Sequence, residues 1–157
     1  MRFDFDLVFS VPGAPDAETL MAALAEAGCD DALPGFGAAG LVALAFSRDG
    51  AAPDPVIAEA LAQARAALPD GARLREVRPD LVSLAEVAAR LSVSRQALQK
   101  RAMPPPSLGG LYRATELAPV LASQPGKIRT GLEGARGWFE AAEAAQRINA
   151  RLALGDL

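Results

Sequence analysis

Hydrophobic and polar residues alternate at the start of the chain. The apolar members of this alternation are Phe3, Phe5, Leu7, Phe9 and Val11. A period of two residues predicts a strand with one buried face, which ends at Pro12-Gly13. An apolar stripe at helical spacing follows from Leu20 to Ala27, so we expect a helix that is capped by Asp16 and stopped by Gly28.

A second set of elements is predicted within residues 41–78. The uninterrupted apolar run Leu41–Phe46 is bounded by glycine on one side and by a polar turn on the other, which is typical of a central strand covered on both faces. Asp54 as a cap and Pro55 at the first helical position predict a second helix. In the last strand, Ala72–Arg78, two apolar residues are out of phase and indicate a bulge.

These elements have the order βα(β)βαβ, where the bracketed strand is a short one that could form around Ala32–Leu33. This order is the ferredoxin-like plan, in which two helices cover one face of a single sheet. We therefore expect a ferredoxin-like domain of the α+β class over residues 1–79. Pro79-Asp80 is the junction to the rest of the chain, and it is so short that the two parts should pack against each other.

The middle of the chain predicts two short helices joined by a tight turn. Ser83 stands three residues before Glu86, which is the spacing of a capping box. The apolar face of the first helix consists of Leu84, Val87, Ala88 and Leu91. Ser92-Val93-Ser94 interrupts this pattern, and Ser94 can cap a second helix over residues 95–101. Two such helices on a three-residue turn form a helix-turn-helix.

A proline run, Pro104–Pro106, follows the two helices. Leu108–Arg113 then has the pattern of two strand-like pieces around a Gly-Gly turn, and another helix comes next. This order resembles the winged helix-turn-helix of the MerR and phage excisionase (AlpA-like) families over residues 83–122. The chain departs from their pattern in its long proline run and in Ser92, where glycine is commonest. The resemblance implies a winged helix-turn-helix DNA-binding domain over residues 80–123.

The outward positions of the second helix carry long hydrogen-bond donors. Arginine, glutamine and lysine are the types that read base edges or phosphates in a major groove, so we expect a recognition helix at residues 94–102. Ser94 and Arg90 would touch the DNA backbone, and Arg113 on the wing would hold phosphate or a minor-groove edge. The candidate DNA-binding residues are Arg90, Ser94, Arg95, Gln96, Gln99, Lys100, Arg101, Gly110 and Arg113.

Charge is distributed unevenly along the chain, whose formal net charge is −3. Residues 1–83 hold 6 basic and 13 acidic residues, whereas residues 84–113 hold 5 basic residues and 1 acidic residue. A basic segment in an acidic protein concentrates the attraction for phosphate at the helix-turn-helix. Arg73, Arg75 and Arg78 lie outside this segment, and they could either extend the phosphate-binding surface or neutralise the acids around them.

Several function classes lack their usual residues. The chain has no histidine and a single cysteine, Cys29, which disfavours zinc sites and Ser-His catalysis. Gly35–Gly40 spells the dinucleotide fingerprint, but a strand-like run follows it where a helix would be needed. No apolar run approaches the roughly 20 residues that span a bilayer, and the first residues do not form a signal peptide. We expect a cytoplasmic protein that is no enzyme and needs no cofactor or metal.

The last part, residues 124–157, predicts a long helix that begins near Leu132 or Ala135 and ends at Leu154. Its apolar seam consists of Trp138, Ala141 or Ala142, Ala145, Ile148 and Leu152. The seam could join two copies, as the dimerisation helix of MerR-type regulators does, or it could fold back on its own chain. A loop over residues 122–131 precedes this helix and could touch DNA through Lys127 and Arg129.

We therefore expect a sequence-specific, double-stranded DNA-binding protein, most simply a dimeric transcriptional regulator. The N-terminal domain would oligomerise or receive a small ligand or a protein partner. One alternative is a protein-interaction module, such as an antitoxin or anti-regulator, that docks a partner through the same fold. A second alternative is an enzyme that binds a nucleotide at Gly35–Gly40.

Overall fold

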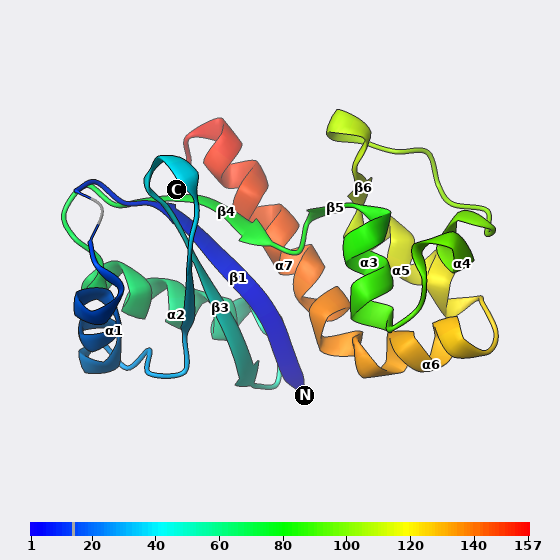
Figure 1. Cartoon of the computed structure of the whole chain (residues 1–157), viewed down its shortest axis with the longest axis horizontal. Helices are drawn as coiled ribbons and strands as arrows, with labels where there is room; N and C mark the ends of the chain where they lie inside the picture. The colour runs from blue at the N-terminus through cyan, green and yellow to red at the C-terminus, as the bar shows by residue number, and fades with distance from the viewer. Residues whose placement is uncertain (14) are drawn as a thin grey trace.

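The computed structural model describes residues 1–13 and 15–157, so Ala14, in the turn predicted after the first strand, lies outside the described residues. The chain is α+β, with a four-stranded antiparallel sheet in the order β2-β3-β1-β4 and a second sheet of β5 and β6 (Figure 1). The strands are β1 (Arg2–Ser10), β2 (Leu33–Phe36), β3 (Leu41–Asp49), β4 (Arg73–Arg78), β5 (Leu81–Val82) and β6 (Tyr112–Arg113). The α-helices of the described residues are α1 (Ala17–Glu26), α2 (Pro53–Ala67), α3 (Leu84–Leu91), α4 (Arg95–Gln99), α5 (Ala114–Ala122), α6 (Lys127–Gly134) and α7 (Arg136–Leu154).

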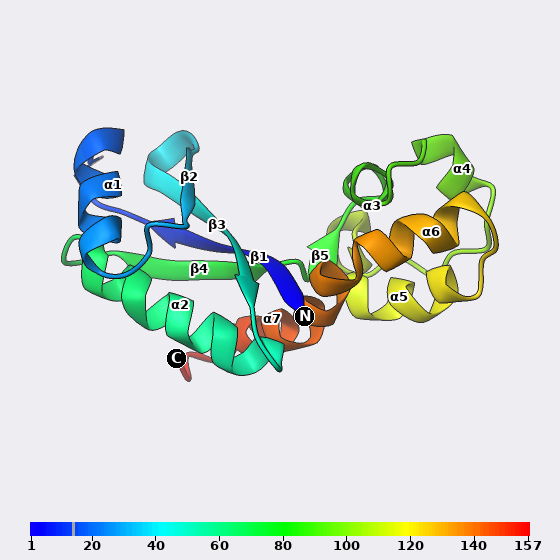
Figure 2. The ribbon, with the colours of Figure 1, turned by 90° about the horizontal axis from the view of Figure 1, so that it is seen from below.

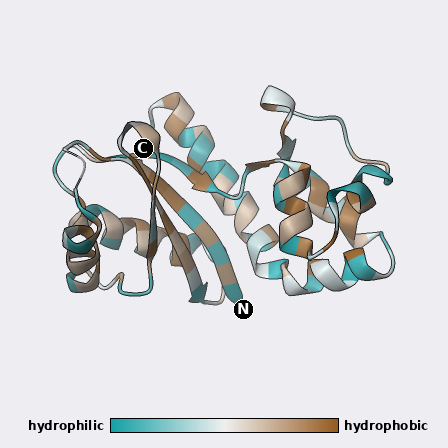
Figure 3. Ribbon diagram, in the orientation of Figure 1, coloured by the Kyte–Doolittle hydropathy of each residue, from teal (hydrophilic) through white to brown (hydrophobic). Residues whose placement is uncertain are grey.

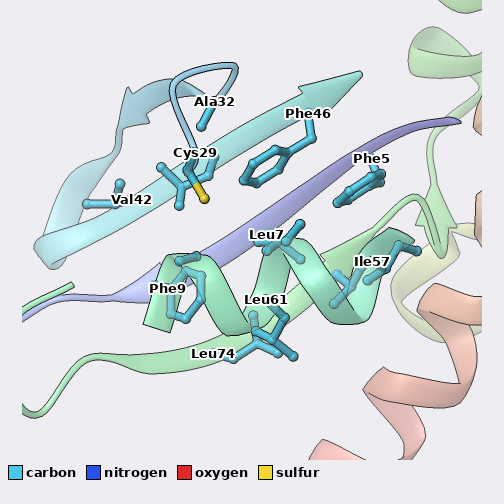
Figure 4. Packing of buried hydrophobic residues seen from close by; sticks show 14 of the residues in the cluster. Phe5, Leu7, Phe9, Cys29, Ala32, Val42, Phe46, Ile57, Leu61 and Leu74 are labelled. Carbon is cyan, nitrogen blue, oxygen red and sulfur yellow. The ribbon is translucent and has the colours of Figure 1, made fainter. Parts of the chain in front are cut away.

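The alternation in β1 builds one face of the larger hydrophobic core, and Figure 3 shows it along the strand. Its apolar residues are buried, as the period of two predicts. Phe5 lies opposite Phe46 of β3, and the two rings stack with 5.3 Å between their centroids. Leu20 of α1 and Ile57 of α2 belong to the same cluster, part of which is drawn in Figure 4. Burying each large apolar side chain stabilises the fold by about 1.5–3 kcal/mol, so this face holds the sheet and both helices together.

Strand β3 differs from its prediction, because only one of its faces is covered. Val42, Leu44 and Phe46 are buried, whereas Ala43 and Ala45 between them are half-buried. The strand is interior in the sheet, as predicted, but both helices pack on the side of Val42. An apolar run was therefore a poor guide to two-sided burial, since alanine is small enough to lie on the open face of a sheet.

Helix α2 begins earlier than predicted. Its first residue is Pro53, and the cap residue Ala52 makes no side-chain hydrogen bond. Proline is favourable at the first helical position because its missing N–H would be unpaired there anyway. Asp54 then lies in the first turn, where the helix dipole favours an acid. The predicted cap at Asp54 is therefore wrong, although the helix itself is confirmed.

The bulge predicted in the last strand is confirmed. The pairing of β1 with β4 shifts register between Val8 and Phe9. In a regular strand, residues three apart point to opposite faces. The extra residue lets Leu74 and Val77 both reach the core, where both are buried.

The second hydrophobic core lies among α3, α4, α5, α6 and the start of α7. Its largest buried members are Leu91, Leu98, Leu117, Leu121, Ile128, Trp138 and Phe139. The loop predicted for residues 122–131 is wrong, because Lys127–Gly134 forms α6. The glycines of this segment lower its helix propensity, but Gly131 also allows α6 to approach the backbone of α3. A Cβ at Gly131 would lie 2.2 Å from the carbonyl oxygen of Leu91.

Helix α7 connects the two cores, as Figure 2 shows. Ala142 belongs to the second core, whereas Ala141 and Ala145 belong to the first. The Asn149 amide accepts a hydrogen bond from the backbone N–H of Val77 at 2.8 Å and donates to its carbonyl oxygen at 2.8 Å. It thereby satisfies backbone groups on the outer edge of β4. Of the two alternatives for this helix, the one in which its seam folds back on the same chain is observed.

Asp80, at the predicted junction, is buried and binds three elements. Its carboxylate accepts from the Arg113 guanidinium at 2.7 Å and from the Asn149 side-chain amide at 2.9 Å. Its carbonyl oxygen accepts from the backbone N–H of Ala114 at 2.8 Å. The junction is thus tied to β6, α5 and α7, and the two parts of the chain pack closely. No helix among the described residues is long and apolar enough to cross a membrane.

Candidate nucleic-acid interface

The two helices predicted for the middle of the chain, α3 and α4, form with the predicted caps. The Ser83 hydroxyl accepts from the Glu86 N–H at 3.1 Å, and the Ser94 hydroxyl accepts from the Ala97 N–H at 3.1 Å. Each bond satisfies one of the free N–H groups at a helix start. Between the helices, Ser92 adopts a left-handed conformation with φ 54° and ψ 40°. This is the conformation that makes glycine the commonest residue at such a turn.

Replacing Ser92 by glycine should raise the free energy of unfolding by about 1 kcal/mol, because a side chain in the left-handed region is strained. Chemical denaturation measures this change. Ser123→Gly is the matched control, since Ser123 has φ −82° and donates from its hydroxyl to the Val120 carbonyl oxygen. The control should lose stability. A gain in both variants would contradict the strain argument.

Helix α4 presents the predicted donors to solvent. It is shorter than predicted, since it ends at Gln99 with Lys100 as its cap. Leu98 is fully buried and anchors the helix. The exposed residues of α4 and its flanks are Ser94, Arg95, Gln96, Gln99, Lys100 and Arg101. Within the described residues, Arg95, Lys100 and Arg101 have no carboxylate within 4.0 Å.

A groove of about 610 Å³ separates the start of α4 from the start of α6. Ser94 and Arg101 lie on one side, and Lys127 with Pro125 and Gly126 lies on the other. Lys127 is exposed, and among the described residues it has no ion-pair partner. The fold therefore places Lys127, which was predicted to lie in a loop, beside α4, the predicted recognition helix. Sequence reasoning missed that α6 supplies it, because glycines hide the helical pattern.

Arg90 lies at the edge of this surface, where it lines a second groove with Gly126 and Lys127, but its guanidinium also has partners within the chain. Its guanidinium is 3.8 Å from the Asp4 carboxylate and stands over the Trp138 ring at 5.2 Å from the centroid. It lines the junction between the sheet and α3, together with Asp6. Burial raises the pKa of the Asp6 carboxyl above its usual range, although the guanidiniums of Arg78 and Arg90 pull it down. Arg90 therefore has a structural role at the junction, and its contact with the DNA backbone stays a prediction.

Arg113 is also engaged elsewhere. Its guanidinium is 23% exposed and pairs with the buried carboxylate of Asp80. If Arg113 moved away, the Asp80 carboxylate would stay buried without a counter-charge, which costs several kcal/mol. Arg113 therefore has a structural role in this fold, and its contact with phosphate stays a prediction.

The predicted wing takes a different form. Leu108–Gly110 forms a 3₁₀ turn, and the strand Tyr112–Arg113 pairs with Leu81–Val82 before α3. A hairpin across Gly109–Gly110 is therefore wrong. Gly110 is exposed and has φ 74°. The loop between α4 and β6 lies at the top of Figure 1, whereas α6 lies at the bottom. Both glycines are needed for the tight turn, since their positive φ values disfavour side chains.

Two other sequence features lie in the four-stranded part. Gly35 belongs to β2, and the run that ends at Gly40 leads directly into β3, as the loop interpretation predicts. Cys29 is buried, and burial raises the pKa of its thiol despite the nearby Arg48 guanidinium. A thiol with a raised pKa is a poor nucleophile.

Comparisons with protein families, with curated proteins and with solved structures find no match to this chain.

Proposed function

We propose that this protein binds double-stranded DNA in a sequence-specific manner, with α4 in the major groove. The observation that carries this proposal is the set of exposed donors on α4. A cation that is paired with a carboxylate must lose that partner before it binds phosphate. In the described structure Arg95 and Lys100 have no such partner to lose. Their position on the second helix of a helix-turn-helix is the one that enters the groove in such proteins.

The proposed architecture is a ferredoxin-like domain followed by a helix-turn-helix of the winged type. The strand order β2-β3-β1-β4 with antiparallel neighbours supports the first assignment. The short β5–β6 pair supports the second, although the loop at Gly109–Gly110 replaces a hairpin wing. We propose that this protein acts as a transcriptional regulator, with the sheet domain carrying the helix-turn-helix on a rigid base.

Each residue on the surface has a proposed role that follows from its chemistry. The Arg95 guanidinium can donate twice to guanine, and the Gln99 amide can donate to adenine N7 and accept from its N6–H, so both suit bidentate base contacts. Ser94, Arg101 and Lys127 surround the groove between α4 and α6 and suit phosphate oxygens. Phosphate contacts position the protein, and base contacts select the sequence.

Replacing Arg95 or Gln99 by alanine should lower the discrimination between a preferred site and a one-base variant by about 1–3 kcal/mol. The preferred site is first selected from a random duplex library with the parent protein. Fluorescence anisotropy at a fixed salt concentration then gives both affinities. Arg147→Ala is the control, because it removes the same charge from an exposed arginine of α7 that pairs with Asp54.

The control should change both affinities slightly and equally. Unchanged discrimination in Arg95→Ala and Gln99→Ala would contradict the groove assignment. If the library yields no site and the purified protein instead retains a stoichiometric protein partner, the protein-docking alternative replaces this proposal.

A further inference from the structure

The basic residues of the acidic N-terminal part divide into two groups. Arg48 pairs with Asp31 at 2.8 Å, Arg78 pairs with Glu76 at 2.7 Å, and Arg2 donates to the Ser47 hydroxyl at 2.9 Å. The remaining basic residues of this part are Arg65, Arg73 and Arg75. Among the described residues these three arginines have no carboxylate within 4.0 Å, the chain terminus included.

The three unpaired arginines meet at one place. They line a groove of about 500 Å³, which we call the three-arginine groove. Arg65 comes from α2, and Arg73 and Arg75 come from β4. The end of α7 and the residues after it close the groove with Leu152, Gly155 and Leu157. No aspartate or glutamate side chain of the described residues lines it.

Arg73 and Arg75 reach this groove from one strand because they stand on either side of Leu74, and residues next to one another in a strand point to opposite sides. Arg73 pairs with Ser10 of β1, whereas Arg75 lies at the register shift and has no paired residue. Leu74 between them is buried in the core. Both guanidiniums therefore stay exposed beside an apolar floor. Arginines that only neutralise nearby acids would form ion pairs, as Arg48 and Arg78 do. Arg73 and Arg75 form none among the described residues.

We propose that the three-arginine groove is a binding site for a phosphate-bearing ligand. Guanidinium groups bind phosphate oxygens in pairs of parallel hydrogen bonds, and several of them around one groove can hold a doubly charged group. The volume lies in the range of small-ligand sites. The apolar floor of Leu74 and Leu152 suits an uncharged part of the same ligand.

This site is separate from the proposed DNA-binding surface. Arg73 lies opposite Ser10 at one end of β1, whereas α3 approaches Asp4 near the other end. Six residues of strand span roughly 20 Å. Figure 1 likewise shows the chain end and α4 on different sides of the molecule. The phosphate could belong to a free phosphate ester or to the backbone of flanking DNA.

The test is calorimetric titration of the whole protein with inorganic pyrophosphate at low salt, with a parallel anisotropy titration of a random duplex. The double variant Arg73→Gln/Arg75→Gln and the single variant Arg65→Gln probe the groove from two elements. A charge-assisted hydrogen bond contributes about 1.5–3 kcal/mol, so the affinity for the probe should fall about tenfold or more for each lost guanidinium. All three side chains are exposed, and circular dichroism and thermal unfolding check that the fold is kept.

The control is Arg95→Gln/Lys100→Gln, which removes the same charge from α4. Pyrophosphate binding that the groove variants lose and the control keeps supports a free phosphate ester as the ligand. No pyrophosphate binding, with duplex affinity reduced by the groove variants, supports DNA phosphates. The proposal is overturned if the groove variants change neither titration, or if they change pyrophosphate binding no more than the control does. If only the control loses duplex binding, and the groove variants bind pyrophosphate as the parent does, the DNA proposal stands and this one is refuted.

Discussion

Replacing Gly137 by alanine should lower the free energy of unfolding by about 3 kcal/mol or more. Gly137 lies in the first turn of α7, directly against β1. A Cβ at this position would lie 1.7 Å from the carbonyl oxygen of Arg2 and 2.9 Å from its carbonyl carbon. These are backbone atoms of a strand, so no change of side-chain rotamer can relieve the overlap. The helix must move away from the sheet.

The loss of stability expected for Gly137→Ala is opposite in sign to the usual effect of such a substitution in a helix. Alanine in a helix is ordinarily more favourable than glycine by about 1 kcal/mol. Gly134→Ala is therefore the matched control, because a Cβ at Gly134 of α6 would meet nothing within 4 Å. Urea denaturation should show the control as stable as the parent or more stable, and Gly137→Ala as much less stable. Equal behaviour of the two variants would mean that α7 does not approach β1 so closely.

Replacing Asp80 by alanine should have the second large effect, a loss of about 3 kcal/mol. The Asp80 carboxylate is the ion-pair partner of Arg113 and also accepts from Asn149. Removing one partner of a largely buried pair leaves the other charge uncompensated. The amide of Asn149 would also lose one of the bonds that orient it toward Val77. The junction of the two parts would therefore loosen.

Asp54→Ala provides the comparison, because the chain offers a second aspartate–arginine pair of equal length. Asp54 and Arg147 also approach to 2.7 Å, but both side chains are more than half exposed. An exposed pair contributes only about 0–1 kcal/mol. If denaturation shows equal losses for Asp80→Ala and Asp54→Ala, burial does not set the strength of the Asp80 pair.

Both predictions concern contacts that hold α3 and α4 on the four-stranded sheet. Gly137 and Asn149 lie on α7, which contributes to both hydrophobic cores. A rigid attachment fixes where α4 stands relative to the three-arginine groove. Variants that loosen α7 should therefore be avoided in the binding experiments, and surface substitutions are preferred there.

Local patterns were sufficient for most elements. The alternation from Phe3 to Phe9 predicted β1 and its buried face, because side-chain direction in a strand depends only on position. Ser83 and Ser94 predicted two helix starts, because each cap bonds a backbone group three residues away. Even the bulge in β4 was visible, since Leu74 and Val77 cannot both face the core of a regular strand.

Contacts between distant residues were not visible in the same way. Helix α6 contains glycines that argue against it locally, and its formation depends on the close approach of Gly131 to Leu91. The intrachain partners of Arg90 and Arg113 were hidden for a similar reason. Both arginines lie in a segment that holds a single acidic residue, yet their partners in space are Asp4 and Asp80. The positive charge of each arginine predicted that it binds an anion. Only the fold placed a carboxylate of the same chain beside it.

The sequence by itself determined most element types, the caps of α3 and α4 and the exposed donors on α4, because each of these depends on residues within one or two turns of one another. The tertiary structure decided which cations remain free. Arg95 and Lys100 stay unpaired, Arg90 and Arg113 are engaged inside the chain, and Arg65 joins two arginines of β4 across the fold. The interaction energy of two charges depends on the distance between them, and for residues far apart in the sequence that distance is set only by tertiary packing.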